Sequence, residues 1–267
     1  MLSLILEPWS YPFMQRALLI AIAIGVMCAI FSCFLILKGW ALLGDALSHA
    51  VLPGIAVAYL LGWPLYIGAV GGGVLCMGLI QSIHTRVKPD ALMGVIFSGL
   101  FGFGLVMLSR IESDVHLLHS LFGNILGVSN QDVVATLGVS VLSSGLMLLK
   151  RRDLMLHCFD PVYGKTIYLS PYLDAALRIA LVLCIVTALK STGILLVIAL
   201  LITPGAIGLL LGRSPDQMIG IAVSSIILAS ISGVWLSFYL NIATGPFIIL
   251  IQFILFLIAL YYYMQRT

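Results

Sequence analysis

The chain has 267 residues, of which 62% are apolar and 9% are charged, whereas soluble domains have roughly 45–50% apolar and about 25% charged residues. A water-soluble fold of this composition would expose large apolar patches, which soluble monomers rarely do, and a disordered chain requires low hydrophobicity. The net charge of +3 comes without a long basic run, so we expect no nucleic-acid partner. We therefore expect an integral membrane protein surrounded by lipid.

Nine apolar runs are long enough to span a bilayer, which takes about 20 helical residues. In chain order they cover 14–37, 41–61, 64–83, 90–108, 132–149, 172–189, 193–211, 217–239 and 245–264. The sequence thus predicts an all-α, polytopic bundle of nine transmembrane helices, or eight if one run is re-entrant. Because the runs leave no room for a soluble domain, we predict a single transmembrane domain over residues 1–267.

Two inserts between the runs are longer than ordinary loops. The insert 109–131 holds an apolar stretch too short to span, which predicts a re-entrant or gate segment. The insert 150–171 begins with three consecutive bases, which is typical of a cytoplasmic segment. With nine spans, nine of the thirteen bases fall on this same side, so the N-terminus is expected outside and the C-terminus inside.

The second apolar run contains the two residues most expected to carry function. Asp45 and His49 are ionisable residues inside a span, where such residues are costly and mark functional sites, and their i, i+4 spacing places them on one helix face. An oxygen and a nitrogen ligand suit manganese, ferrous iron or zinc. Because two ligands hold an ion weakly, two chains about a two-fold axis would supply four. The alternative is a structural hydrogen bond between helices.

Prolines and polar residues elsewhere in the runs predict local features. Pro53 in the second run, and Thr203 with Pro204 in the seventh, predict kinks that can act as gates. Arg178 is expected to extend its charged end to the interface. Carboxylates at the starts of four runs are expected to cap helices; they are Asp90, Asp132, Asp174 and Asp216.

The sequence contains no motif that is typical of an enzyme. Gly164, Lys165 and Thr166 resemble the end of a phosphate-binding loop, but Phe159 stands where that motif needs a glycine. No nucleophile arrangement is recognisable at useful spacing. We expect no enzyme activity and no permanently bound cofactor.

Five stretches together resemble the permease subunits of bacterial manganese, iron and zinc ABC importers. The most specific is GDALSHAVLPG, within Leu37 to Gly62; the others are LFGNILG (Leu121 to Gly127), FDPVYGK (Phe159 to Lys165), VIALLITPGAIGLLL (Val197 to Leu211) and ISGVWLSFYLNIATGP (Ile231 to Pro246). The resemblance implies a type II ABC importer-like fold in the bacterial inner membrane. It also implies that Asp45 and His49 line the metal path, and that Phe159, Asp160 and Gly164 couple to the ATPase.

From this resemblance we expect an ATP-driven importer whose cargo is Mn²⁺, Fe²⁺ or Zn²⁺. The expected partners are a cytoplasmic ATP-binding subunit, a second permease chain that is a copy or a paralogue, and an extracytoplasmic metal-binding protein. One alternative is a secondary metal transporter driven by an ion gradient, which would favour inverted repeats and a second buried carboxylate. Another is a structural membrane protein in which Asp45 and His49 only hold helices together.

Overall fold

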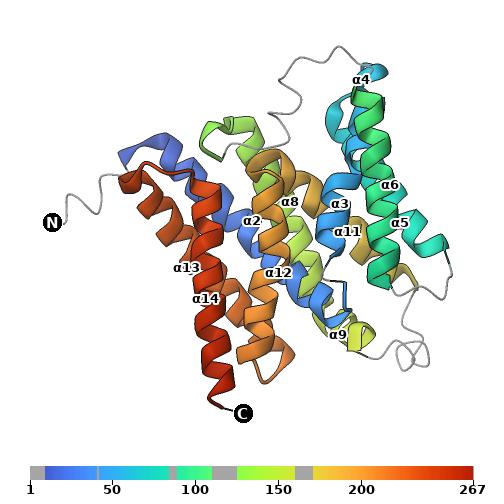
Figure 1. Cartoon of the computed structure of the whole chain (residues 1–267). Coiled ribbons are helices and arrows are strands. Elements are labelled where there is room, and N and C mark those ends of the chain that lie inside the picture. The colour runs from blue at the N-terminus through green and yellow to red at the C-terminus, as the bar shows by residue number, and fades with distance from the viewer. Residues whose placement is uncertain (1–9, 41, 84–88, 110–124, 160–170, 267) are drawn as a thin grey trace.

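The computed structural model describes residues 10–40, 42–83, 89–109, 125–159 and 171–266, and every regular element in these ranges is a helix (Figure 1). In chain order they are α2 (Pro12–Leu37), α3 (Leu43–Ala50), α4 (Leu52–Leu60), α5 (Leu65–Ser82), α6 (Pro89–Ser109), the 3₁₀ turn η2 (Ile125–Gly127), α8 (Asn130–Leu149), α9 (Arg151–Phe159), α11 (Pro171–Thr192), α12 (Ile194–Leu211), α13 (Pro215–Leu240) and α14 (Thr244–Met264).

Nine helices within the described residues are long and apolar enough to span a bilayer, with α3 and α4 together counting as one, Leu43–Leu60. Each coincides with one of the nine predicted runs to within a few residues. The all-α, multi-spanning bundle expected from the sequence is therefore confirmed, with nine candidate spans in the described part rather than eight.

The second span is interrupted between α3 and α4. Val51 separates the two helices, although its backbone keeps helical angles, with φ −68° and ψ −25°. Two residues later comes Pro53, which has no N–H to donate to the carbonyl of His49 and whose ring crowds that turn. Helix α3 therefore ends half a turn ahead of the proline, and the kink expected from Pro53 stays a prediction.

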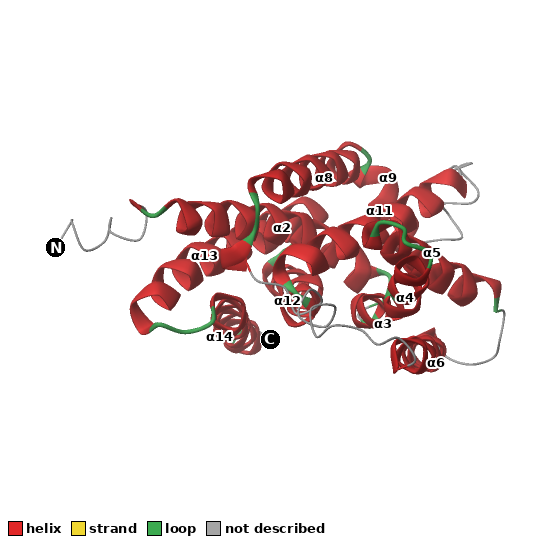
Figure 2. Ribbon diagram, turned by 90° about the horizontal axis from the view of Figure 1, so that it is seen from above, coloured by secondary structure: helices red, strands yellow, loops and turns green. Residues whose placement is uncertain are grey.

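Helix α2 forms the centre of the bundle. Figure 2 shows it between α8 on one side and α12 and α13 on the other, and its buried residues include Ile20, Ile24 and Phe31. Helices α6 and α14 lie along the edge opposite α8 (Figure 2) and are the least buried spans. Their exposed apolar side chains match the hydrocarbon that surrounds a membrane protein.

The seventh span, α12, continues through Pro204 with help from α2. The hydroxyl of Ser32 donates to the carbonyl of Ile202, at 3.1 Å, and accepts from the backbone N–H of Gly205, at 2.9 Å. A Cβ on Gly205 would collide with the hydroxyl and backbone of Ser32, so glycine permits this close approach. The hydroxyl therefore supplies polar partners where the proline disturbs the helical hydrogen bonds.

Helices α4 and α5 also meet at backbone distance. A Cβ on Gly54 would collide with the carbonyl of Gly68, and a Cβ on Gly68 with the carbonyl of Gly54. Small residues at such positions let membrane helices approach closely and gain van der Waals contact. This contact holds α4 in place directly after the interruption at Val51.

The two long inserts are described in part. The outer insert 109–131 contributes η2 and the first residues of α8, while 110–124 lie outside the described residues. The insert 150–171, which was predicted only as a cytoplasmic segment, begins with helix α9. This helix contacts α2. The predicted gate and coupling roles of these inserts stay predictions.

We predict that Ser32→Ala destabilises the chain by about 1–2 kcal/mol, because the Gly205 N–H and the Ile202 carbonyl lose a buried partner. The measurement is thermal unfolding of the purified chain in one detergent. Ser224→Ala is the matched control, since within the described part of the chain this exposed hydroxyl bonds to the Ile221 carbonyl in its own helix and to no other helix. Equal melting temperatures for Ser32→Ala and the wild type would contradict the assignment.

Candidate functional site

Helix α3 presents one polar face on an otherwise buried helix. Six of its eight residues are buried, and the two that are not are Asp45 and His49. Their side chains keep 38% and 24% of their surface exposed, and Nε2 of His49 lies 3.5 Å from Oδ1 of Asp45. The i, i+4 spacing has therefore brought a carboxylate and an imidazole together, as the sequence predicted.

Two aromatic rings of α6 hold the imidazole of His49 in place. Its ring centroid lies 5.2 Å from that of Phe97 and 5.0 Å from that of Phe101, the latter in an edge-to-face arrangement. Such pairs have a preferred geometry and contribute about 0.5–1.5 kcal/mol each. The rings form an apolar wall beside the imidazole while Nε2 stays on the side of Asp45.

The other ring nitrogen of His49, Nδ1, is buried and has no hydrogen-bond partner among the described residues. Within that part of the chain, no third His, Cys, Asp or Glu side chain joins the pair to form a cluster that could hold a metal. The Asp45–His49 pair therefore offers one imidazole nitrogen and one carboxylate to a metal ion. Any further ligand would have to come from outside this pair.

Helix α3 lies among other helices of the bundle, and two of them carry the prolines predicted as gates. Figure 1 shows α3 below α4 and above α9, and α3 contacts α6 and α12. Pro53 is buried at the start of α4, where a Cβ on Gly104 of α6 would meet it. In α12, Pro204 is buried and Thr203 is half-buried. The described residues thus put Pro53 near the site's helices, while a gating movement of Pro53, Thr203 or Pro204 stays a prediction.

The predicted coupling residues lie at the edge of what is described. Phe159 is the last residue of α9, and Asp160 and Gly164 lie outside the described residues. At the other end of α9, Nε of Arg151 lies 3.0 Å from Oδ1 of Asp216 at the start of α13. This ion pair ties the beginning of the predicted cytoplasmic segment to a second span.

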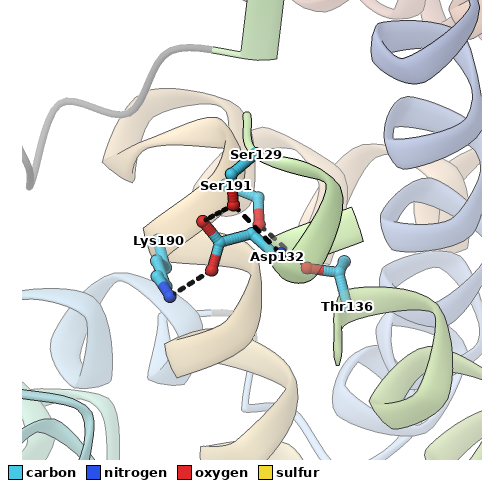
Figure 3. Close-up of polar contacts among 5 residues, drawn as sticks. All are labelled: Ser129, Asp132, Thr136, Lys190 and Ser191. Atoms are coloured by element: carbon cyan, nitrogen blue, oxygen red, sulfur yellow. Dashed lines mark hydrogen bonds and ion pairs between the residues drawn. The ribbon is translucent and has the colours of Figure 1, made fainter. Parts of the chain in front are cut away.

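A polar cluster joins the start of α8 to the end of α11 (Figure 3). Ser129 caps α8 by accepting from the N–H of Asp132, and its hydroxyl donates to Oδ2 of that carboxylate at 2.8 Å. Lys190 of α11 donates to Oδ1, and the hydroxyls of Thr136 and Ser191 lie 3.1 Å apart. Asp132 therefore belongs to a helix cap, as predicted, and it also binds a second helix.

Sequence reasoning missed three contributors to these contacts. Phe97 and Phe101 look like ordinary apolar residues of a span, and only their i, i+4 spacing hinted at a shared face. Lys190 belongs to no motif that would mark it as a partner of Asp132. Each contact joins helices far apart in the sequence, so no local pattern carries it.

Comparison with known proteins adds to this geometry. A model of the ABC 3 transport family matches residues 10–263. The chain is 49% identical to the chelated iron transport system membrane protein YfeD of Yersinia pestis over 264 residues, which cover 97% of this chain and 89% of that protein. It is 43% identical to the manganese transport system membrane protein MntB of Synechocystis over 260 residues, which cover 96% and 85%.

Solved structures agree with the fold. A chain of PsaBC from Streptococcus pneumoniae, solved in complex with a Fab, has a TM-score of 0.85 and 33% identity, with 97% of this chain and 95% of that chain covered. An inward-facing transporter assigned to the metal-chelate ABC type has a TM-score of 0.67 at 17% identity, covers 92% and 85%, and shows the fold alone. The chain belongs to the ABC 3 transport family of membrane permeases.

Proposed function

We propose that the chain forms the translocation path of an ATP-driven importer for divalent transition metal ions: Mn²⁺, Fe²⁺ or Zn²⁺. As a member of its family it is a multi-pass permease of the bacterial cytoplasmic membrane and a transport subunit, not an enzyme. The observation that carries the metal assignment is the Asp45–His49 pair, since an oxygen and a nitrogen ligand suit these ions. Relatives named as iron and manganese transport proteins support it.

A second permease chain is part of this proposal. Asp45 and His49 are partly exposed on the surface of one chain, yet ionisable side chains in a span do not face hydrocarbon. A second chain, a copy or a paralogue, that places its own pair opposite would cover this face and bring four protein ligands to one ion. Incomplete coordination by each chain suits a transporter, because the ion must also leave.

The energy is proposed to come from a separate cytoplasmic ATP-binding subunit, as membership of an ABC transport family supports. Phe159, Asp160 and Gly164 would contact that subunit, and α9 would pass movement to α2 and, through Arg151 and Asp216, to α13. An extracytoplasmic metal-binding protein would deliver the ion at the opposite side. The ABC family assignment argues against the alternative of a secondary transporter driven by an ion gradient.

We predict that Asp45→Asn and His49→Ala each lower metal uptake in cells by more than about tenfold, since even an outer-shell partner of a bound metal is worth at least that in affinity. Uptake of radioactive Mn²⁺, Fe²⁺ and Zn²⁺ is measured at matched expression in the membrane. Ser224→Ala is the control, because Ser224 is an exposed residue of α13 that lies outside both the Asp45–His49 pair and the insert 150–171. Wild-type uptake of all three ions by both site variants would refute the ligand roles.

Replacing Phe97 and Phe101 by Leu should weaken the site without removing a ligand. Each aromatic pair with His49 holds the imidazole by about 1 kcal/mol, so we expect the double variant to raise the KM of uptake by about fivefold or more while the maximal rate changes little. Phe103→Leu, on an exposed position of the same helix, is the control. An unchanged KM in the double variant would show that the rings do not position the imidazole.

Coupling is tested by co-purification. We expect Asp160→Ala combined with Gly164→Leu to abolish capture of an ATPase subunit by the tagged chain, because both residues lie in the segment proposed to dock on it. Arg213→Gln, a base on the same predicted side but outside that segment, should leave capture intact. Normal capture by the double variant would move the docking surface elsewhere on the cytoplasmic side.

A further inference from the structure

Helix α3, which carries Asp45 and His49, is too short to fix its own position in the bundle. Its eight residues, Leu43–Ala50, rise about 12 Å, and a helix of two turns depends on its surroundings. Its sides pack against α6 and α12, where a Cβ on Gly44 would meet Leu201 of α12. Asp45 lies in the first turn of α3 and His49 in the last. The connection that precedes α3 is therefore the one closest to the carboxylate.

A tight turn with a glycine in the left-handed conformation follows α2. Gly39 has φ +68°, its N–H donates to the carbonyl of Ile36 at 3.0 Å, and the N–H of Trp40 donates to the carbonyl of Leu35 at 2.8 Å. This pair of hydrogen bonds ends a helix and favours glycine, which tolerates a positive φ. The carbonyl of Trp40 then accepts from the N–H of Leu43, the first residue of α3, at 3.0 Å. The backbone of Trp40 is thus bonded to the last turn of α2 and to the first turn of α3.

The indole ring of Trp40 is held in place as well. Trp40 is half-buried and packs against the core of the bundle, and the ammonium nitrogen of Lys38 lies 4.4 Å from the centroid of its ring. A cation this close to the face of an indole is attracted by the quadrupole of the ring. Tryptophan also favours the interface between hydrocarbon and headgroups, and Lys38 lies on the side that the bases predict to be cytoplasmic. The ring therefore resists movement of the turn along the membrane normal.

The far end of the same span repeats the turn without the packed ring. Gly62 has φ +67°, and the N–H of Trp63 closes the turn on the carbonyl of Ala58 at 2.8 Å. Trp63, however, is 57% exposed, and the interruption at Val51 separates this end of the span from α3. The two turns share their backbone chemistry, but of the two it is the turn at Gly39 that adjoins α3.

We propose that Trp40 is a positioning residue for Asp45: through the turn at Gly39 it sets how far α3 extends into the membrane, and thus where the carboxylate meets the ion. The inference rests on the proposed role of Asp45 as a metal ligand. Trp40 acts through the backbone and is not a ligand, since an indole offers a donor and no acceptor. Bonds from carboxylate oxygens to zinc are about 2.0–2.2 Å long, so a shift of α3 by about 1 Å would take the carboxylate out of bonding distance.

The two glycine turns provide a matched pair of variants. Gly39→Ala and Gly62→Ala each place an L-residue at a positive φ, and in the described part of the chain the added methyl group meets nothing within 4 Å at either position, so both carry the same backbone strain. Uptake of radioactive Mn²⁺ is measured at matched expression in cells that carry the complete importer, and melting temperatures are measured on the purified chains.

We expect similar melting temperatures for the two glycine variants, but different transport. Gly39→Ala should raise the KM of uptake by about fivefold, because strain at this turn lowers the fraction of chains that hold Asp45 in place. Gly62→Ala should leave the KM at the wild-type value, because α4 is held separately by its close contact with α5. Equal KM values for the two variants would overturn the proposal.

Replacement of the ring tests whether Trp40 acts through Asp45. Trp40→Leu should raise the KM by about fivefold with little change in the maximal rate, and Trp40→Phe, which keeps a ring beside Lys38, should restore most of the wild-type value. In the Asp45→Asn background, Trp40→Leu should lower the residual uptake no further, since a residue that only positions Asp45 then has nothing left to position. A reduction by the same factor in both backgrounds would show that Trp40 acts independently of Asp45 and would overturn the proposal.

The positioning role and the proposed function fail in different ways. Wild-type uptake by Asp45→Asn refutes the ligand role of Asp45, and the positioning role with it. Reduced uptake by Asp45→Asn, together with a wild-type KM for both Gly39→Ala and Trp40→Leu, refutes the positioning role alone.

Discussion

Hydrocarbon offers no partner to a polar group, so a polar group inside the membrane is stabilised when it finds one within the protein. This constraint accounts for several polar contacts between helices of the bundle. Ser32 of α2 serves the disturbed turn of α12 around Pro204. In the same way the amide of Gln252 on α14 donates to the hydroxyl of Ser225 on α13 at 3.1 Å. Each contact fixes one pair of helices at a defined depth and rotation.

The same constraint makes α3 exceptional. Its other six residues are buried, while the side chains of Asp45 and His49 are partly exposed on the surface of the chain. A carboxylate left in this way is costly in a bilayer unless water, an ion or another protein meets it. Phe97 and Phe101 shield one side of the imidazole, and α3 ends at Ala50, directly after His49.

At the ends of the spans, ion pairs connect further helices. Asp132 and Lys190 join α8 to α11 on one side of the bundle, and Arg151 and Asp216 join α9 to α13 on the other. Pairs this exposed contribute little to stability on their own. They connect helix ends that lie next to the two long inserts, 109–131 and 150–171.

Much of this protein follows from its sequence alone. The position of the spans, the interruption of the second span near Pro53 and the pairing of Asp45 with His49 were predictable, because span length, proline chemistry and i, i+4 spacing are local properties of a helix. Tertiary structure decided what faces each of these features. The rings beside His49 and the hydroxyl beside Gly205 come from residues distant in the chain, and nearly uniform apolar faces do not specify in advance which helix will lie against which.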